Sequence, residues 1–514
     1  MSTANRIIKN SIYLFIKMCV TMFVSLYTTR IVLQSLGASD FGVFNIIGGS
    51  IAMLGFLNST LAYATQRFMT YAKGEGNLEK QSKIFNISLL LHMLIAIVTM
   101  LIQIALMYPL FNGILNIASG RELAAKVVYI SLIISTGVHI INATYDAVMN
   151  AHENMRFYSI IGIIDAILKL LVAFACLHTC YDKLILYGIL MSMVPIIIFL
   201  ITSVYCHKRY IECVISLKTY WDVAIVKDIT TFSIWNFFTA VSSLFSVQGV
   251  GLIMNHFYGS ALNAAQGIAV QLNGYLSAFA ANMLKAINPV IVKNAGANDL
   301  TSMNHITILS CKYATYLIIL FAIPCILEIN FLLKFWLGNV PVWTALFCIL
   351  QIIQALILQM SGPVATAVYG QGSIKYFSIL KTTMNLLPLL VTYIAFRFNA
   401  APYWIYIPMI ILYAVGGNII ILYFASKNCS LSYKEYLRGV ILPVFIVILF
   451  MLILGAIPVV LMLSSFYRLC ITILFSTVGF TISAYLFGMQ SYEKNYIKSM
   501  LIKIKSNYLD KIFG

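Results

Sequence analysis

The side chains best suited to chemistry in this sequence are charged groups inside long apolar stretches. Lys17 lies in the first such stretch, and Asp165 and Lys169 lie four residues apart in a later one. A charge near the centre of a bilayer costs about 2.5–3.5 kcal/mol on insertion scales, so charges retained there usually have a role. Ammonium groups bind phosphate or diphosphate, and a buried carboxylate can exchange a proton. Asp165 and Lys169 also share a helix face, where they can simply neutralise each other.

Further charges lie nearer the ends of the apolar stretches. Arg30 is close to the expected outer end of the first stretch, from which its long side chain can reach the interface. Four more charges lie nearer the expected cytoplasmic ends, on Arg67, Asp146, Lys285 and Lys312. Each of these side chains either belongs to a site or is solvated at a helix end. The first stretch contains no Asp or Glu. Its charge therefore suits an anionic ligand such as a diphosphate better than a cationic drug.

Two histidines, His92 and His139, lie singly within expected helices. Each is either a packing residue or part of a proton relay. Cys176, His178 and Cys180 resemble a metal-ligand set, but on a helix the imidazole would point away from both sulfurs, so we expect no metal site. The sequence also lacks a glycine-rich nucleotide loop and the common hydrolase motifs. We therefore expect a protein that is not an enzyme, with no catalytic residues and no bound cofactor. Its energy is expected from an H+ or Na+ gradient, from the membrane potential, or from consumption of the product on the far side.

These residues must be positioned by membrane-spanning elements. The chain has 514 residues, of which 61% are hydrophobic and only 10% are charged, and its mean hydropathy is +0.93. Apolar stretches recur along its whole length, and each is long enough to cross a bilayer as a helix, for which roughly 20 residues suffice. We expect an all-α polytopic membrane protein with about fourteen transmembrane helices. Their centres are expected near Met22, Ala52, Ile95, Ser135, Leu168, Met193, Ala240, Leu272, Leu317, Gln354, Leu387, Ile411, Val447 and Phe475.

The charge distribution predicts the orientation in the membrane. The formal net charge is +17, and most of the 33 Lys and Arg residues fall on one side once the spans are assigned. By the positive-inside rule, both termini are expected in the cytoplasm. The basic tail is then expected to face solvent or anionic lipid, so no nucleic-acid partner is expected. The first apolar stretch is too long for the core of a signal peptide and is expected to remain as the first span.

An internal repeat predicts the domain organisation. Residues 155–160 (Met-Arg-Phe-Tyr-Ser-Ile) return as residues 374–379 (Ile-Lys-Tyr-Phe-Ser-Ile), at an offset of 219. Other matches, including Gly74 with Gly296, fit an offset of 222. Six spans per copy keep both copies in the same orientation, which predicts two pseudo-symmetric six-helix lobes related by an axis along the membrane normal. The expected parts are an N-lobe at 1–206, a cytoplasmic interfacial linker at 207–227, a C-lobe at 228–426, two C-terminal helices at 427–489 and a basic cytoplasmic tail at 490–514.

Four segments carry a resemblance to a known family. They are residues 25–30 (Ser-Leu-Tyr-Thr-Thr-Arg), 36–42 (Leu-Gly-Ala-Ser-Asp-Phe-Gly), 64–68 (Ala-Thr-Gln-Arg-Phe) and 151–155 (Ala-His-Glu-Asn-Met). The sequence resembles bacterial O-antigen and capsule repeat-unit flippases, the polysaccharide-transporter branch of the multidrug/oligosaccharidyl-lipid/polysaccharide exporter superfamily. The resemblance covers essentially the whole chain and is most specific over its first third.

The resemblance implies a multi-pass protein of the bacterial cytoplasmic (inner) membrane that acts in polysaccharide and lipopolysaccharide biosynthesis. Its implied activity is to move an undecaprenyl-diphosphate-linked oligosaccharide from the cytoplasmic to the periplasmic leaflet by alternating access. In that family a cationic central cavity receives the diphosphate and sugars. The matching positions in this sequence are Lys17, Arg30, Arg67 and Lys169, and the less distinct second-lobe match adds Lys285 and Lys312.

Two other functions fit parts of the sequence. A cation-coupled multidrug exporter of the same superfamily would share the fold but needs acidic groups, of which Asp146 and Asp165 are the clearly intramembrane ones. A membrane polysaccharide polymerase or glycosyltransferase would need a long outer loop, whereas the expected outer connections are short. The coupling candidates are Asp165, Asp146, His92 and His139. The expected partners are the polyprenyl-diphosphate-linked glycan and membrane lipids, with a polysaccharide polymerase or chain-length protein as a further candidate.

Overall fold

The computed structural model describes residues 3–52, 55–111, 120–338, 340–491 and 493–495. Over these residues the regular structure is entirely helical, so the all-α prediction is confirmed. Thirteen helical stretches in this part of the chain are long and apolar enough to cross a membrane, and they match thirteen of the expected spans. The remaining expected span, centred near Ala52, includes residues 53 and 54, which lie outside the described residues.

The helices form two compact units. Unit 1 comprises Met1–Ser243, Asn282–Met303 and Thr366–Thr382. Unit 2 comprises Leu244–Ala281, Asn304–Ala365 and Thr383–Gly514. The division into lobes on either side of residues 207–227 remains a prediction. Four helices contribute residues to both units: α7 (Val223–Gly296), α8 (Leu300–Leu327), α10 (Thr344–Gln371) and α11 (Lys375–Arg397).

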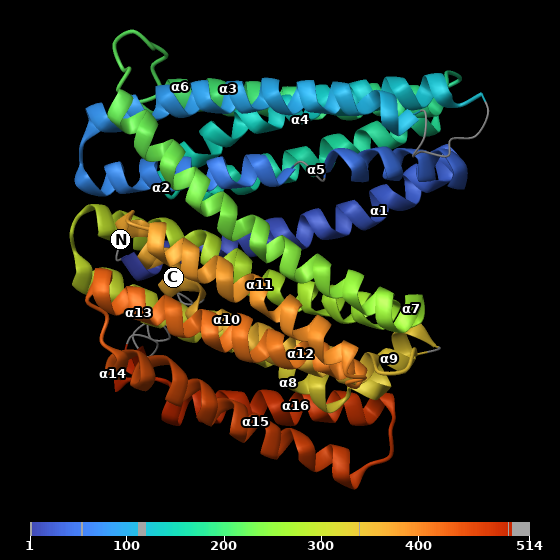
Figure 1. The fold of residues 1–514 in the computed structure, drawn as a ribbon, viewed down its shortest axis with the longest axis vertical. Helices are drawn as coiled ribbons and strands as arrows, with labels where there is room; N and C mark the ends of the chain where they lie inside the picture. The colour runs from blue at the N-terminus through green and yellow to red at the C-terminus, as the bar shows by residue number, and fades with distance from the viewer. Residues whose placement is uncertain (1–2, 53–54, 112–119, 339, 492, 496–514) are drawn as a thin grey trace, which may run out of the picture. The chain divides into compact units, whose positions relative to one another are not determined.

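Unit 1 is built mainly from the first six helices, which run alongside one another in Figure 1. Helix α4 packs against α2, α3 and α6, while α5 packs against α1 and α6. Their bounds are α1 (Thr3–Ala52), α2 (Gly55–Glu75), α3 (Leu78–Pro109), α4 (Glu122–Ala151), α5 (Met155–Leu177) and α6 (Lys183–Arg209).

Helices α4 and α6 run parallel in a constant register. In the C-terminal third of both helices, the Thr202 hydroxyl donates a hydrogen bond to Asn142 Oδ1 at 2.6 Å. Just beyond their ends, His152 and Glu212 form an ion pair. Both pairs join residues that are 60 positions apart in the sequence. This register brings the α4–α5 turn close to the chain that follows α6.

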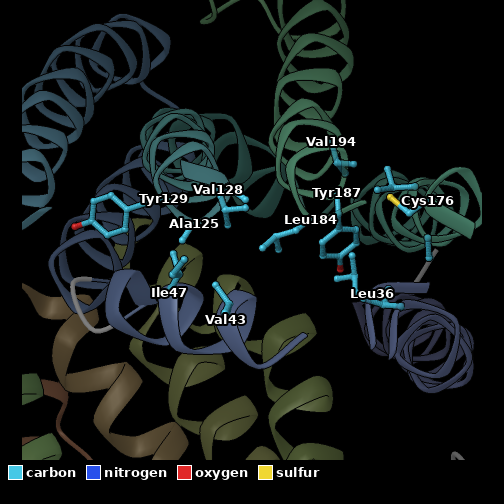
Figure 2. Close-up of a cluster of buried hydrophobic side chains, with 14 of the residues drawn as sticks. Leu36, Val43, Ile47, Ala125, Val128, Tyr129, Cys176, Leu184, Tyr187 and Val194 are labelled. Carbon is cyan, nitrogen blue, oxygen red and sulfur yellow. The ribbon is translucent and has the colours of Figure 1, made fainter. Parts of the chain in front are cut away.

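A buried apolar core joins α1 to the other helices of unit 1. Gly37 interrupts α1 with a φ of 76°, a conformation that glycine adopts without steric cost, in the outer connection expected between the spans centred near Met22 and Ala52. Beyond this break, Val43 and Ile47 lie in the same buried cluster as Ala125 and Val128 of α4, as Figure 2 shows. Lipid tails are as apolar as these side chains, so close packing is what stabilises such a core inside a membrane.

Two glycines related by the sequence repeat make reciprocal contacts in unit 1. A Cβ atom on Gly74 of α2 would overlap the carbonyl oxygen of Lys293 in α7, and one on Gly296 of α7 would overlap the carbonyl oxygen of Tyr71 in α2. Gly296 follows Gly74 by 222 residues, and Lys293 follows Tyr71 by the same number. Exchanged contacts of this kind are those of a local two-fold axis. They support the duplication inferred from the sequence.

Local sequence explains where several helices of unit 1 begin. Asn77, Asn154, Asp182 and Asp222 each precede a helix, and each side chain accepts a hydrogen bond from a backbone N–H of the first turn. Such N-caps stabilise a helix by about 1 kcal/mol each, because they satisfy donors that have no partner within the helix.

Unit 2 contains the C-terminal part of the chain, with α15 and α16 side by side in Figure 1. These two helices are the ones expected beyond the duplicated region. Two ion pairs are buried in this unit, Glu328 with Arg468 and Lys312 with Glu493. Besides the shared helices, its elements are α9 (Ile329–Leu337), α12 (Tyr406–Pro408), α13 (Gly417–Cys429), α14 (Tyr433–Tyr436), α15 (Leu442–Leu461) and α16 (Phe466–Ser483), with π-helical turns at Met409–Gly416, Leu437–Ile441 and Ala484–Gly488.

Candidate functional site

Two lysines and a tyrosine from three helices meet inside unit 1. The Nζ atom of Lys17 lies 4.2 Å from the centre of the Tyr158 ring, and the Nζ atom of Lys285 lies 4.0 Å from it. Lys285 also donates a hydrogen bond to the Tyr158 hydroxyl. We call these three residues the lysine–tyrosine cluster. The aromatic ring stabilises both cations, which would otherwise repel each other at close range.

The face of α5 that meets α1 explains how Lys17 reaches this position. Tyr158, Gly162, Asp165 and Lys169 follow one another at helical spacing and so lie on one stripe of α5. Gly162 lies opposite Lys17, and a Cβ atom there would overlap the Lys17 Cε atom. Glycine at this position therefore leaves room for the lysine side chain between the two helices.

Buried apolar residues hold the cluster in place. Leu14 of α1, Met155 of α5 and Ala286 of α7 form a small buried core, and Tyr158 packs against it. Asn282 donates a hydrogen bond to the Met18 sulfur at 3.0 Å, which joins this part of α7 to α1. Lys17 directly precedes Met18 in the sequence, and Lys285 directly precedes Ala286, so each lysine adjoins a residue that makes these contacts. Their positions are consequently determined by packing of the helix backbones.

One acidic residue of α4 faces the cluster. Asp146 is half-buried and interacts electrostatically with Lys285, His139 and Lys17. His139 lies seven residues earlier on the same face of α4 and is exposed. The structure therefore brings together four of the residues expected to form a site: Lys17, Lys285, Asp146 and His139. Two ammonium groups against one carboxylate leave a net positive charge.

Lys169 and Asp165 form an ion pair with each other. Their Nζ and Oδ2 atoms are 2.7 Å apart on α5, and the two side chains are 41% and 34% exposed. This is the neutral pair that their spacing allowed. Lys169 lies eleven residues beyond Tyr158, or roughly 16 Å along the helix axis, so it lies outside the lysine–tyrosine cluster.

Arg67 closes the end of α10 within unit 1. Its Nε atom donates to the Tyr369 carbonyl at 3.1 Å and its Nη2 atom donates to the Gly370 carbonyl at 2.6 Å. Gly372 follows with a φ of 87°, and a Cβ atom there would lie 2.6 Å from Arg67 Nη2. An arginine that satisfies the last carbonyl groups of a helix in this way is a C-terminal cap.

Three other candidate residues lie away from the cluster. Arg30 is exposed, and it lies thirteen residues after Lys17, which is roughly 220° around the helix. His92 is fully buried in α3, where its Nδ1 atom hydrogen-bonds with the Ser88 carbonyl at 2.8 Å. Lys312 belongs to unit 2, where its Nζ atom lies 2.6 Å from Glu493 Oε1 and 3.1 Å from the Gly488 carbonyl oxygen.

Tyr158 is the site residue that reasoning from the sequence missed. Its spacing carried a signal, because it lies seven residues before Asp165 and hence on the same helix face. The repeat carried a second signal. At the offset of 219, Tyr158 corresponds to Phe377, so the hydroxyl group is present in one copy and absent from the other.

The cluster has the groups needed to bind a multiply charged oxyanion. Each lysine supplies ammonium donors, and the Tyr158 hydroxyl, which accepts from Lys285, keeps its own hydrogen free to donate. Hydrogen bonds from charged donors to phosphate oxygens are roughly twice as strong as neutral ones. Within the described part of the chain, no three His, Cys, Asp or Glu side chains come together in a group that could hold a metal ion.

Comparison with known proteins shows what this fold is similar to. No family model and no curated protein sequence matches the chain. Among solved structures, a MATE protein in the bent conformation matches with a TM-score of 0.70 at 14% identity, over 84% of this chain and 96% of the other. A multidrug resistance MATE family transporter of the MOP superfamily, in an outward-facing conformation, matches with a TM-score of 0.68 at 13% identity, over 83% and 96% of the two chains.

A third structure differs in its binding pocket. It is a MOP superfamily transporter from Pyrococcus furiosus, for which a reversed polarity of the binding pocket suggests a different function. It matches with a TM-score of 0.67 at 14% identity, over 83% of this chain and 95% of the other. At these identities the likeness shows the fold alone. The chain thus has the fold of the MATE transporters of the MOP superfamily.

Proposed function

We propose that this protein is a flippase that moves a polyprenyl-diphosphate-linked oligosaccharide across the membrane by alternating access, and that the lysine–tyrosine cluster binds the diphosphate. The observation that carries the proposal is that Lys17 and Lys285 both contact the Tyr158 ring, with Asp146 as the acidic neighbour. A net positive site inside a membrane unit is costly unless it is matched by an anion. A diphosphate supplies that match.

The other expected cations have different roles in this proposal. Arg67 is a positioning residue, because it holds the end of α10 through backbone carbonyl groups. Lys169 and Lys312 are neutralised by Asp165 and Glu493, so we leave both outside the diphosphate site. Arg30 is exposed and, by its direction on α1, meets lipid headgroups or a more distant part of the substrate.

We infer that the position of Asp146 makes substrate binding depend on protonation of this carboxylate. A proton on this carboxylate would remove the acidic group that competes with an anionic substrate for Lys17 and Lys285. Proton binding and substrate binding would then favour each other, and by linkage the effect is reciprocal. His139, on the same face of α4, is the second candidate for this exchange. Asp165 stays paired with Lys169 and His92 is buried in α3, so neither is placed in the proton path.

A multidrug exporter is the alternative with specific support, because a multidrug resistance transporter shares this fold. It would place a cationic drug against Asp146, where two lysines oppose it. A polymerase or glycosyltransferase has no such support from the fold. For the flippase we propose the bacterial cytoplasmic membrane as the location, with both termini in the cytoplasm, and a polysaccharide polymerase or chain-length protein as a partner in the cell.

A translocation assay in proteoliposomes tests the proposal. The substrate is a fluorescent undecaprenyl-diphosphate-linked oligosaccharide, and its appearance in the outer leaflet is followed with a membrane-impermeant quencher. We expect Lys17→Ala and Lys285→Ala each to reduce the rate about tenfold or more, since each removes a charge-assisted contact of about 1.5–3 kcal/mol. Lys227→Ala, on the first turn of α7, is the control that keeps the wild-type rate. Export of a cationic dye but not of the glycan would favour the multidrug function instead.

A further inference from the structure

A cavity of about 590 Å³ opens at the end of unit 1 where α4, α5 and α6 meet. The side chains that define its chemistry are His152, Asn154, Arg156, Phe157, Tyr205 and Arg209. It lies at the N-terminal end of α5, which is the expected cytoplasmic end. Residues 152–154, which line it, belong to one of the segments that carry the family resemblance, but the proposed transport route makes no use of the cavity.

The acidic groups of this cavity are already paired. Glu153 forms ion pairs with Arg6 at 2.8 Å and with Lys293 at 3.6 Å. Glu153 has a φ of 55°, so the turn between α4 and α5 directs its carboxylate to these two cations. Nearby, Glu212 pairs with His152, whose ring lies against that of Tyr210. The carboxylates at the cavity are consequently not available to neutralise further cations.

Two arginines remain for a ligand. Arg156 and Arg209 line the cavity and are exposed, and among the described residues neither has an ion pair or hydrogen bond. Two aromatic rings line the same cavity. The rings of Phe157 and Tyr205 stack with their centres 3.5 Å apart, and Asn154 donates a hydrogen bond to the Tyr205 hydroxyl at 2.8 Å.

This cavity is separate from the lysine–tyrosine cluster. Arg156, Phe157 and Ile160 lie on one face of α5, while Tyr158 and Gly162 lie on the face that meets Lys17. Ile160 also lines the cavity and is 43% exposed. In a membrane an exposed isoleucine on such a helix contacts lipid tails, so the polar cavity continues directly into an apolar surface.

We propose that this cavity binds the phosphate headgroup of an anionic phospholipid of the membrane, with one acyl chain lying along Ile160. Arg156 and Arg209 bind the phosphate oxygens, a contact that guanidinium groups make with two parallel hydrogen bonds. Basic pockets between transmembrane helices on the cytoplasmic side are suited to such headgroups. The site binds a resident lipid and is independent of the proposed cargo.

Native mass spectrometry of the full-length protein tests this site. The protein is purified with phosphatidylglycerol, or with phosphatidylcholine as the zwitterionic comparison, and the tightly bound lipids are counted. The variant is Arg156→Gln/Arg209→Gln, and the matched control is Lys208→Gln, which changes an exposed cation beside Arg209 that does not line the cavity. We expect wild type and control to retain one more phosphatidylglycerol than the double variant, whose affinity falls about tenfold or more.

A thermal unfolding arm separates a lipid from a free phosphate. Short-chain phosphatidylglycerol should raise the Tm of wild type and of Lys208→Gln but not that of the double variant, and inorganic phosphate should raise none of them. The Tm without added ligand shows that the double variant is folded. Equal retention of phosphatidylglycerol by wild type and double variant would overturn the proposal. An increase in the Tm of wild type with inorganic phosphate that equals the increase with the lipid would also overturn it. Neither result depends on transport, so failure here leaves the flippase proposal untouched.

Discussion

Gly74 and Gly296 occupy equivalent positions in the two copies of the repeat, and each lies against the backbone of the helix that carries the other. Each contact places a backbone carbonyl where a side chain would begin, so neither position has space for a Cβ atom. We expect Gly74→Ala and Gly296→Ala each to destabilise the protein by about 1–3 kcal/mol, the usual cost of overpacking. Thermal unfolding in detergent measures the change.

A matched control for the two glycines is Gly274→Ala in α7, where an added Cβ atom has open space around it. That variant should unfold at or above the wild-type temperature, because alanine is the better helix former. If the three variants shifted the Tm equally, the reciprocal contact would not be the cause.

The hydroxyl of Tyr158 should matter to binding more than to stability. Tyr158→Phe keeps the ring beside Lys17 and Lys285 but removes the oxygen that accepts from Lys285 and can donate to an anion. We expect the free energy of diphosphate binding to weaken by about 0.5–1.5 kcal/mol, while the Tm changes little. Isothermal titration with a short-chain polyprenyl diphosphate provides the measurement. Wild-type affinity in Tyr158→Phe would remove the hydroxyl from the site.

The buried pair of Lys312 and Glu493 should act as a structural unit. Their side chains are 2% and 5% exposed and their charged atoms are 2.6 Å apart. Lys312→Met alone leaves an unpaired buried carboxylate and should cost about 3–5 kcal/mol of stability. Lys312→Met/Glu493→Leu should recover most of that loss, and a double-variant cycle of unfolding free energies gives the coupling. Strictly additive losses would contradict this role and would make Lys312 a candidate for substrate binding again.

The ion pair between His152 and Glu212 predicts a loss of stability at acid pH. Burial alone would raise the pKa of Glu212, but the hydrogen bond with His152 and nearby positive charge hold that pKa below its ordinary value. A depressed carboxyl pKa stabilises the folded state above the ordinary value of about 4.3, and the stabilisation is lost as the pH falls through the folded-state pKa. Tm values measured from pH 7 down to acid pH should show this decline.

Glu212→Gln is the comparison for that pH dependence. It should unfold at a lower temperature than wild type at neutral pH and should approach the wild-type Tm at acid pH, where the wild-type carboxyl group is protonated. Parallel curves for the two proteins over the whole range would show that Glu212 contributes nothing to the acid-induced loss.

Helices were predictable from the sequence because each is a long apolar stretch, and the break at Gly37 falls where the first outer connection was expected. The pair of Asp165 and Lys169 was predictable as well, since four residues along a helix bring two side chains together whatever the tertiary fold. These features depend on local spacing alone.

The partners of Lys17 and Lys312 were not predictable in the same way. Lys285 reaches Tyr158 across 127 residues, and Lys312 reaches Glu493 across 181. Such contacts depend on which helices pack together and on their rotation about their axes. Helical periodicity gives the face of a residue, but it does not say which other helix meets that face.

The central claim is that the lysine–tyrosine cluster binds a diphosphate, and direct titration tests it most closely. Purified wild type and the Lys17→Glu/Lys285→Glu variant are each titrated with a short-chain polyprenyl diphosphate and, separately, with a lipophilic cation. We expect wild type to bind the diphosphate and the charge-reversed variant, still folded by its Tm, to lose this binding. Diphosphate binding that survives in the charge-reversed variant, or wild type that binds only the lipophilic cation, would contradict it.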